Sequence, residues 1–307
     1  MVDAPAIVQR PTLQQLNLSA GKKARLHRLL YQFGPANGTL LLLPYDHGIE
    51  HGPVDFMDNP DSADPTYLFQ LAIDGNFSGI VTHTGIAQRY YADFAGQIPL
   101  IVKLNGKTTI PPDAEAFSPL TGTVEDAARL GADAVGYTLY IGSPAQDRDM
   151  QQLAMVRKEA DRLGLPLIVW SYPRGKPIEE KAGRDSLYAI DYAARMALEM
   201  GADIVKLNLP KAHKENTKPP DAYRTLEADR AEMTRRVVSS AKRCLVLFSG
   251  GSYKDDETLL ADIDMGMRAG AVGVIAGRNM WQRPREEALA AVKRTHELLG
   301  RYGAPPL

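Results

Sequence analysis

The sequence predicts an α/β fold in which parallel strands, each followed by a helix, close into a single barrel. Short apolar runs alternate with longer segments of helical pattern, and runs that are apolar on both faces are typical of a parallel sheet covered by helices. Eight such runs in 307 residues match the strand number of a (β/α)₈ TIM barrel. A doubly wound open sheet stays the alternative, because counting elements does not prove closure. The runs are Leu40–Tyr45, Gly79–Thr82, Leu100–Leu104, Ala134–Leu139, Leu165–Ser171, Asp203–Leu209, Leu245–Ser249 and Val272–Ala276.

Helix boundaries repeat along the chain in a way that supports this pattern. Gly75, Gly131, Gly201 and Gly270 each stand just before an apolar run. A glycine there favours the left-handed conformation that ends a helix before the next strand. Residues 255–257, two aspartates and a glutamate, open another helix with the negative charge that a helix N-terminus favours.

The chain is predicted to form one domain, since no linker divides it. Residues 1–18 carry prolines and mixed polarity and read as a poorly ordered lead, whereas Ser19–Tyr31 has a possible N-cap and leucines at helical spacing. Two long polar loops, 52–65 and 211–221, each follow a strand and are expected at the functional mouth of the barrel. The predicted boundaries are 1–38 for an N-terminal extension whose helix packs on the barrel, 39–300 for the barrel and 301–307 for a C-terminal tail.

Composition narrows the classes of function. The chain is 44% hydrophobic with 36 basic and 37 acidic side chains, and its net charge of −1 gives no reason to expect nucleic acid or an anionic membrane as partner. No run approaches the roughly 18 apolar residues of a membrane span, and the N-terminus lacks the apolar region of a signal peptide. The one cysteine, Cys244, suits a reducing compartment and reads as a buried structural thiol. A cytoplasmic protein is expected.

Lys206 interrupts the apolar run 203–209 near its end, where a barrel keeps its chemistry. A charged amine is costly to bury, so it either pairs with a carboxylate or has a chemical role. A free lysine, with a pKa near 10.4, is deprotonated in roughly one molecule in 2,500 at pH 7. Desolvation and neighbouring cations such as Arg174 would lower that pKa and favour a Schiff-base nucleophile. Cleavage of a C–C bond beside the resulting imine also needs a proton shuttle, for which Tyr172 and Asp46 are candidates.

The last two strands end in glycine turns, Ser249-Gly250-Gly251 and Gly277-Arg278. Glycines let backbone N–H groups approach an anion, and barrels often bind phosphate after strands seven and eight, so a phosphate site is predicted there. On strand five, alternation puts Trp170, Tyr172 and Arg174 on one face. The tyrosine can move a proton and the arginine fits a phosphate. The alternative for this face is an aromatic packing layer beside an exposed arginine.

His47-Gly48-Ile49-Glu50-His51 matches the H-x-x-E-H zinc pattern. That pattern needs a helix to bring both histidines onto one face, and the glycines and the proline within and after this segment oppose a helix, so no metal is expected. Asp46 and His47, at the end of the first strand, instead suit binding hydroxyls or moving protons. A structural hydrogen-bonding role is the alternative for both.

Residues 105–108 resemble the tail of a phosphate-binding P-loop, but Ile101 stands where that motif requires glycine, so no nucleotide site is predicted. Lys103 and Lys107 remain as cations near the mouth and read as structural or accessory.

Taken together, these motifs resemble those of archaeal-type class I fructose-bisphosphate aldolases, which also occur in bacteria. The resemblance covers about Leu40 to Trp281, and residues 21–28 are similar to the N-terminal helix of bacterial members. Loop 211–221 matches no pattern of the family. The motifs that carry the resemblance are residues 46–53, residues 170–175, the Lys206 strand, residues 249–251 and residues 277–279, in that order.

The resemblance implies a metal-independent enzyme that reversibly cleaves fructose 1,6-bisphosphate, a phosphorylated sugar, into dihydroxyacetone phosphate and glyceraldehyde 3-phosphate. It also implies a large homo-oligomer, and no cofactor is expected. By the same resemblance, Lys206 forms the Schiff base and Tyr172 is the general acid/base. The resemblance also implies residues that line the substrate site, namely Asp46, His47, Trp170 and Asn208. It implies that the phosphate next to the ketone is held by Ser249, Gly250, Gly251, Gly277 and Arg278. Arg174 is implied to hold the distal phosphate.

Two alternatives stay open. A transferase of the same superfamily would use a lysine in this position for aldol-transfer or thiolase-type chemistry on another phosphorylated ketose. A non-catalytic phosphosugar-binding barrel would have no need of a lysine, a tyrosine and an aspartate at three strand ends. Arg174 together with Ser249–Gly251 favours a substrate with two phosphates, and therefore the aldolase.

Overall fold

The computed structural model describes residues 7–226 and 228–305. Its eight strands are all parallel, each pairs with the next along the chain, and β8 pairs back to β1. The predicted closed (β/α)₈ barrel is therefore confirmed, and the open-sheet alternative is wrong. The strands are β1 (Leu40–Tyr45), β2 (Gly79–His83), β3 (Leu100–Lys103), β4 (Ala134–Ile141), β5 (Leu167–Pro173), β6 (Ile204–Leu207), β7 (Leu245–Ser249) and β8 (Gly273–Ile275).

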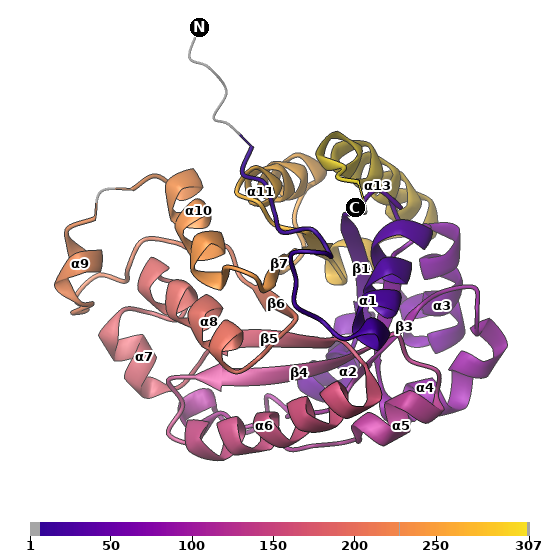
Figure 1. The fold of residues 1–307 in the computed structure, drawn as a ribbon, viewed down its shortest axis with the longest axis horizontal. Coiled ribbons are helices and arrows are strands. Elements are labelled where there is room, and N and C mark those ends of the chain that lie inside the picture. The colour runs from indigo at the N-terminus through magenta and orange to yellow at the C-terminus, as the bar shows by residue number, and fades with distance from the viewer. Residues whose placement is uncertain (1–6, 227, 306–307) are drawn as a thin grey trace, which may run out of the picture.

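Helices surround the strands (Figure 1). No helix among residues 7–226 and 228–305 is long and apolar enough to cross a membrane. The helices are α1 (Ala20–His27), α2 (His47–His51), α3 (Pro65–Asp74), α4 (Thr84–Tyr90), α5 (Val124–Arg129), α6 (Gln146–Leu163), α7 (Lys176–Lys181), α8 (Leu187–Glu199), α9 (Asp221–Arg224), α10 (Arg230–Ala241), α11 (Asp256–Arg268), α12 (Arg278–Trp281) and α13 (Arg285–Leu299). The described chain also contains short helical turns of other types, at Arg28–Gln32, Gly52–Phe56, Pro60–Ala63, Tyr91–Phe94, Asp113–Glu115 and Gly300–Tyr302.

Strand residues alternate between the barrel interior and the layer under the helices. Leu40 and Leu42 belong to an inner cluster to which every strand contributes, whereas Leu41 and Leu43 pack under the helices. Both faces of each strand are thus buried, which explains why the strands are continuous apolar runs. The same alternation decides which polar side chains at the strand ends point into the barrel.

The N-terminal segment closes the other end of the barrel, so the prediction of a poorly ordered lead is wrong for residues 7–18. Leu13 and Leu16 are buried in the inner cluster, and Arg10 donates hydrogen bonds to the carbonyls of Gly38 and Tyr302. The indigo trace runs past α11 (Figure 1), and the Val8 N–H donates to the Arg268 carbonyl there. Residues 1–6 of the predicted lead lie outside the described residues.

The predicted helix caps are confirmed at most positions. Gly131, Gly201 and Gly270 have φ of 74°, 84° and 97°, the left-handed region that favours glycine. At the first junction the prediction is wrong, because Gly75 is right-handed with φ −79° and Asn76 takes the positive φ of 47°. Asparagine is among the residues that tolerate this conformation, which explains the exchange.

Candidate active site

A cavity of about 400 Å³ opens at the C-terminal end of the barrel. Side chains from several strand ends and the loops after them line it, as expected for a catalytic mouth in this fold. The structure brings eleven of the twelve predicted site residues to this cavity; Gly250 is the exception. The eleven are Asp46, His47, Trp170, Tyr172, Arg174, Lys206, Asn208, Ser249, Gly251, Gly277 and Arg278.

Lys206 points into the barrel because it lies two residues after Ile204, which belongs to the inner cluster. Its side chain is buried, and its ammonium lies 5.4 Å from the ring centroid of Trp170 and 5.5 Å from that of Tyr172. Among the described residues it forms no ion pair with a carboxylate, so the predicted alternative of a structural pair is wrong.

Burial lowers the pKa of Lys206 to about 8, against the charges of Asp46 and Glu50, which act to raise it. The cation that adds to the lowering is Arg278, whereas the sequence suggested Arg174. With this pKa about one amine in ten is deprotonated at pH 7, roughly two hundred times the fraction of a free lysine. The position therefore supplies a neutral nucleophile at ordinary pH.

Lys103, which the sequence suggested was structural or accessory, lies at the centre of the charged groups of the cavity. Its Nζ lies 3.1 Å from Oδ2 of Asp46 and 4.5 Å from the ring centroid of Trp170, and it lines the cavity. Burial alone would raise the pKa of Asp46, but the surrounding positive charges, of which Lys103 is the strongest, together outweigh it and hold that pKa far below its usual range. Ile101 on the same strand faces the inner cluster, so the two-residue period that placed Lys206 also places Lys103 inside.

Trp170, Tyr172 and Arg174 line the cavity together, as the strand alternation predicted. Burial, with a further contribution from Glu50, raises the pKa of Tyr172 above its usual range, so its hydroxyl is protonated and can donate. The Arg174 guanidinium lies 5.1 Å from the Tyr172 ring centroid and 3.5 Å from Asp113. Arg174 lines the cavity, and its forked guanidinium fits the oxygens of a phosphate, which favours an anion-binding role over simple exposure.

The segment after β1 is helical, contrary to prediction. Residues 47–51 form α2, and Gly52, with φ 74°, ends this turn rather than preventing it. The His47 and His51 rings are 5.8 Å apart, and Nδ1 of His51 lies 2.6 Å from Asp55. Burial lowers the pKa of His47 to about 4, so this ring is neutral near pH 7. No group of three or more metal-ligating side chains is found within residues 7–226 and 228–305.

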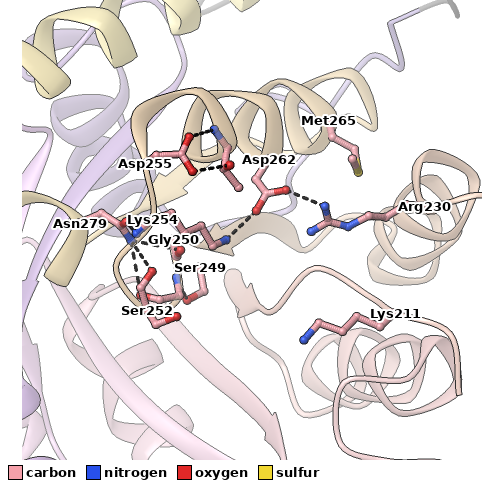
Figure 2. A network of polar contacts seen from close by, with 12 residues as sticks. Lys211, Arg230, Ser249, Gly250, Ser252, Lys254, Asp255, Asp262, Met265 and Asn279 are labelled. Atoms are coloured by element: carbon pink, nitrogen blue, oxygen red, sulfur yellow. Dashed lines mark hydrogen bonds and ion pairs between the residues drawn. The ribbon is translucent and has the colours of Figure 1, made fainter. Parts of the chain in front are cut away.

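The two glycine turns meet at the cavity. A Cβ on Gly277 would lie 2.9 Å from the Pro44 carbonyl, so no other residue fits between β8 and β1 there. Asn279 donates to the carbonyls of Gly250 and Ser252 and fixes the first turn against the second (Figure 2). The Gly250 N–H donates to Ile275 within the sheet, which explains why Gly250 alone of the predicted residues does not face the cavity.

Asn208 and Lys211, which follow β6, form one part of the rim together with Asp185, which lies between α7 and α8. Asn208 donates a hydrogen bond to Asp185 at 3.1 Å, and the Lys211 ammonium lies 3.5 Å from the same carboxylate. Lys211 is the part of loop 211–221 that lines the cavity. The loop without a family pattern thus contributes a cation to the rim.

Two buried N–H donors at this mouth have no partner within the described residues. They are Nε1 of Trp170 and Nε of Arg278. Buried polar groups are normally hydrogen-bonded, and the exceptions in native structures often belong to functional sites. Both residues line the cavity, so both donors suit a polar ligand held between strands β5 and β8.

Comparison with known proteins decides the family that this geometry belongs to. The sequence profile of the family described as DeoC/LacD family aldolase matches residues 40–283. The chain belongs to this aldolase family. The matched range contains β1 to β8 and every side chain of the cavity named above.

Individual relatives agree with this assignment. Fructose-bisphosphate aldolase class 1 of Thermoproteus tenax is 42% identical over 271 residues, which cover 88% of this chain and 92% of that protein. An archaeal fructose-1,6-bisphosphate aldolase, solved with its catalytic lysine covalently bound to the carbinolamine intermediate of the substrate, superposes with a TM-score of 0.76 at 40% identity, covering 91% of this chain and 100% of that chain. 2-Amino-3,7-dideoxy-D-threo-hept-6-ulosonate synthase of Halobacterium salinarum is 33% identical over 272 residues, 89% of each chain. The predicted resemblance to archaeal-type class I fructose-bisphosphate aldolases is confirmed.

Proposed function

We propose that this protein is a class I fructose-bisphosphate aldolase, a carbon–carbon lyase that cleaves fructose 1,6-bisphosphate reversibly through a Schiff base on Lys206. The observation that carries the proposal is a buried lysine with a lowered pKa and no carboxylate partner among the described residues, in a mouth lined by further cations. The family assignment supports aldolase chemistry, and the two named fructose-bisphosphate aldolases support this reaction.

The chemistry begins with attack of the neutral Lys206 amine on the ketone carbon of the substrate. Loss of water from the carbinolamine gives a protonated imine. Removal of the C4 hydroxyl proton then breaks the C3–C4 bond, releases glyceraldehyde 3-phosphate and leaves the electron pair in an enamine. Protonation at C3 and hydrolysis of the imine return dihydroxyacetone phosphate and free Lys206.

Tyr172 is the residue that we assign to proton transfer, because burial keeps its hydroxyl protonated beside the Lys206 amine. Asp46 is ionised and held by Lys103, so we assign to it the orientation of substrate hydroxyls and stabilisation of the cationic imine. Trp170, His47 and Asn208 complete the walls of the substrate site.

The two phosphates are assigned to opposite sides of Lys206. Ser249, Gly251, Gly277 and Arg278 hold the phosphate next to the ketone through the two glycine turns. Arg174 on β5 holds the distal phosphate. Cation sites on both sides of the amine favour a bisphosphate over a substrate with one phosphate, which places the aldolase ahead of the transferase alternative.

The test is borohydride reduction in the presence of fructose 1,6-bisphosphate, followed by peptide mass mapping. We expect one adduct, on Lys206. Replacement by Lys206→Ala should abolish both the adduct and turnover, while Lys158→Ala, on the outer helix α6, is the matched lysine control and should change neither. An adduct elsewhere, or turnover that survives in Lys206→Ala, would refute the assignment.

Three further expectations accompany the proposal. We propose a cytoplasmic location and a large homo-oligomer, both on the resemblance to the aldolase family. The division into an extension (1–38), a barrel (39–300) and a tail (301–307) stays a prediction as well. Light scattering after size-exclusion chromatography tests the homo-oligomer, because a monomer of 33.6 kDa would contradict it.

A further inference from the structure

Asp262 on α11 is a buried carboxylate that does not itself line the cavity, yet both of its partners do. Its Oδ2 accepts a hydrogen bond from the Lys254 ammonium at 2.6 Å, and its Oδ1 lies 2.8 Å from the Arg230 guanidinium. Figure 2 shows Asp262 between these two cations, which come from the β7–α11 loop and from the start of α10. One carboxylate thus fixes two cavity-lining cations that are far apart in sequence.

Lys254 is held from two directions. Its main-chain N–H donates to the Asn279 side chain at 2.8 Å, and the same amide group of Asn279 binds the carbonyls of the Ser249–Gly251 turn and of Ser252. Its ammonium is brought close to that turn, since a Cβ placed on Gly251 would lie 3.7 Å from it. Main chain and side chain of Lys254 are therefore both positioned on the turn that we assign to the ketone-side phosphate.

Arg230 occupies a position that is electrostatically unfavourable for a positive charge. It is the first residue of α10, and a positive charge at a helix N-terminus is unfavourable with the helix dipole. It is also 44% exposed at its side chain, so its ion pair contributes little to stability. The pairing with Asp262 gains its significance from the place where it holds the guanidinium, at the cavity wall.

We infer that Asp262 is a positioning residue that holds Lys254 beside the Ser249–Gly251 turn and Arg230 at the cavity wall, so that both cations bind the phosphomonoester next to the ketone. The inference rests on the proposed function, since it names a further part of the same phosphate site. An ammonium with one proton bonded to Asp262 keeps two for a phosphate, and the guanidinium keeps four of its five donors. Charge-assisted bonds of this kind are stronger than those of backbone amides alone.

The test compares two ketones that differ in one phosphate. Borohydride trapping on Lys206 is measured against the concentration of dihydroxyacetone phosphate and, separately, of dihydroxyacetone. For Asp262→Asn we expect the half-saturating concentration of dihydroxyacetone phosphate to rise about tenfold, the loss of one charge-assisted contact. The half-saturating concentration of dihydroxyacetone should stay unchanged, because this compound has no phosphate to bind.

Two further variants separate positioning from general damage. Asp264→Asn removes a carboxylate of the same helix that pairs with Arg268 and Tyr302, away from the cavity, and should leave both ketones unaffected. In a Lys254→Met background, Asp262→Asn should have a smaller effect than in the wild type, because one of the two cations through which it acts is gone.

The outcomes are distinct. An equal loss with both ketones, no loss with either, or tighter binding of the phosphorylated ketone would each overturn the role of Asp262. Binding of inorganic phosphate, measured by calorimetry, gives the same comparison without imine chemistry and should weaken in Asp262→Asn. If the wild type were not trapped at all, the Schiff-base function would fail while the calorimetric comparison still decided the role of Asp262.

Discussion

The two ends of the β6 segment each carry a buried ionisable side chain, one with an ion-pair partner and one without. At the bottom of the barrel, Asp203 accepts hydrogen bonds from the Lys22 ammonium at 2.7 Å and from the Leu167 N–H at 2.8 Å. At the top, three residues on, Lys206 is equally buried but has no ion-pair partner within the described chain. A satisfied buried charge holds structure together, whereas an unsatisfied one keeps its reactivity.

The difference agrees with a general property of this fold: residues at the N-terminal ends of the strands contribute to stability, and residues at the C-terminal ends carry the chemistry. Lys22 also pairs with Asp161 at 2.7 Å, so one lysine joins α1, α6 and the start of β6. Lys206 instead contacts two aromatic rings, which offer a cation far less than a carboxylate does. Substitutions at the two ends should therefore separate activity from stability.

The largest effect is expected for Lys206→Met. Turnover should fall by about 10⁵-fold or more, because the nucleophile is gone. Stability should rise at pH 7, since the pKa of Lys206 is lowered from 10.5 to about 8 in the folded state and its protonated form is disfavoured by about 3 kcal/mol. That penalty is fully present below pH 8 and disappears as pH rises toward 10.5. Thermal unfolding at pH 7 and pH 10 checks this, and a less stable variant at pH 7 would contradict it.

For Tyr172→Phe we expect turnover to fall by about 10²–10⁴-fold while the Schiff base stays trappable, because proton transfer is lost and the amine is intact. Steady-state assays combined with borohydride trapping measure both. Unchanged turnover would remove the tyrosine from the mechanism.

At the other end of the segment, Lys22→Met should lower the free energy of unfolding by about 3–5 kcal/mol, because it leaves the carboxylate of Asp203 buried without its cation. Turnover of the folded fraction should stay within about twofold of the wild type. Replacing the partly exposed neighbour Lys23 by Met is the matched control and should change neither quantity. A stable Lys22→Met protein would break the contrast between the two ends.

The smallest effect is expected for Glu50→Gln. Glu50 acts to raise the pKa of Lys206, so its removal should lower that pKa and shift the rise of kcat/KM to lower pH. Glu297→Gln, an exposed change on α13, should leave the profile in place. A shift to higher pH would show that Glu50 acts on another group.

Much of the fold was predictable because barrel strands are buried on both faces. All eight apolar runs became strands, and β1 and β7 have the predicted limits. The N-terminal residues 7–18 were misjudged because their burial depends on the barrel bottom, which local sequence does not reveal. The α2 turn was missed because Gly48, Gly52 and the proline after it were taken as barriers, although Gly48 is accommodated within the turn and the other two stand at its end.

The site was predictable where a strand end supplied the residue. Lys206, Trp170 and Tyr172 followed from alternation along β5 and β6, and Lys103 would have followed from the same rule on β3. The ion pairs of Asp262 could not be predicted from strand alternation. They join α10, α11 and a loop, and contacts between separate helices leave no local pattern.

The central claim is that Lys206 is reactive because it is buried as an unpaired amine. The most direct measurement is the pH dependence of adduct formation with dihydroxyacetone phosphate and borohydride, with the modified residue identified by mass mapping. We predict one adduct, on Lys206, whose formation rises with pH through a midpoint of about 8, because the free amine is the reactive form. An adduct on Lys103, or a midpoint near the ordinary lysine value of about 10.4, would contradict the account.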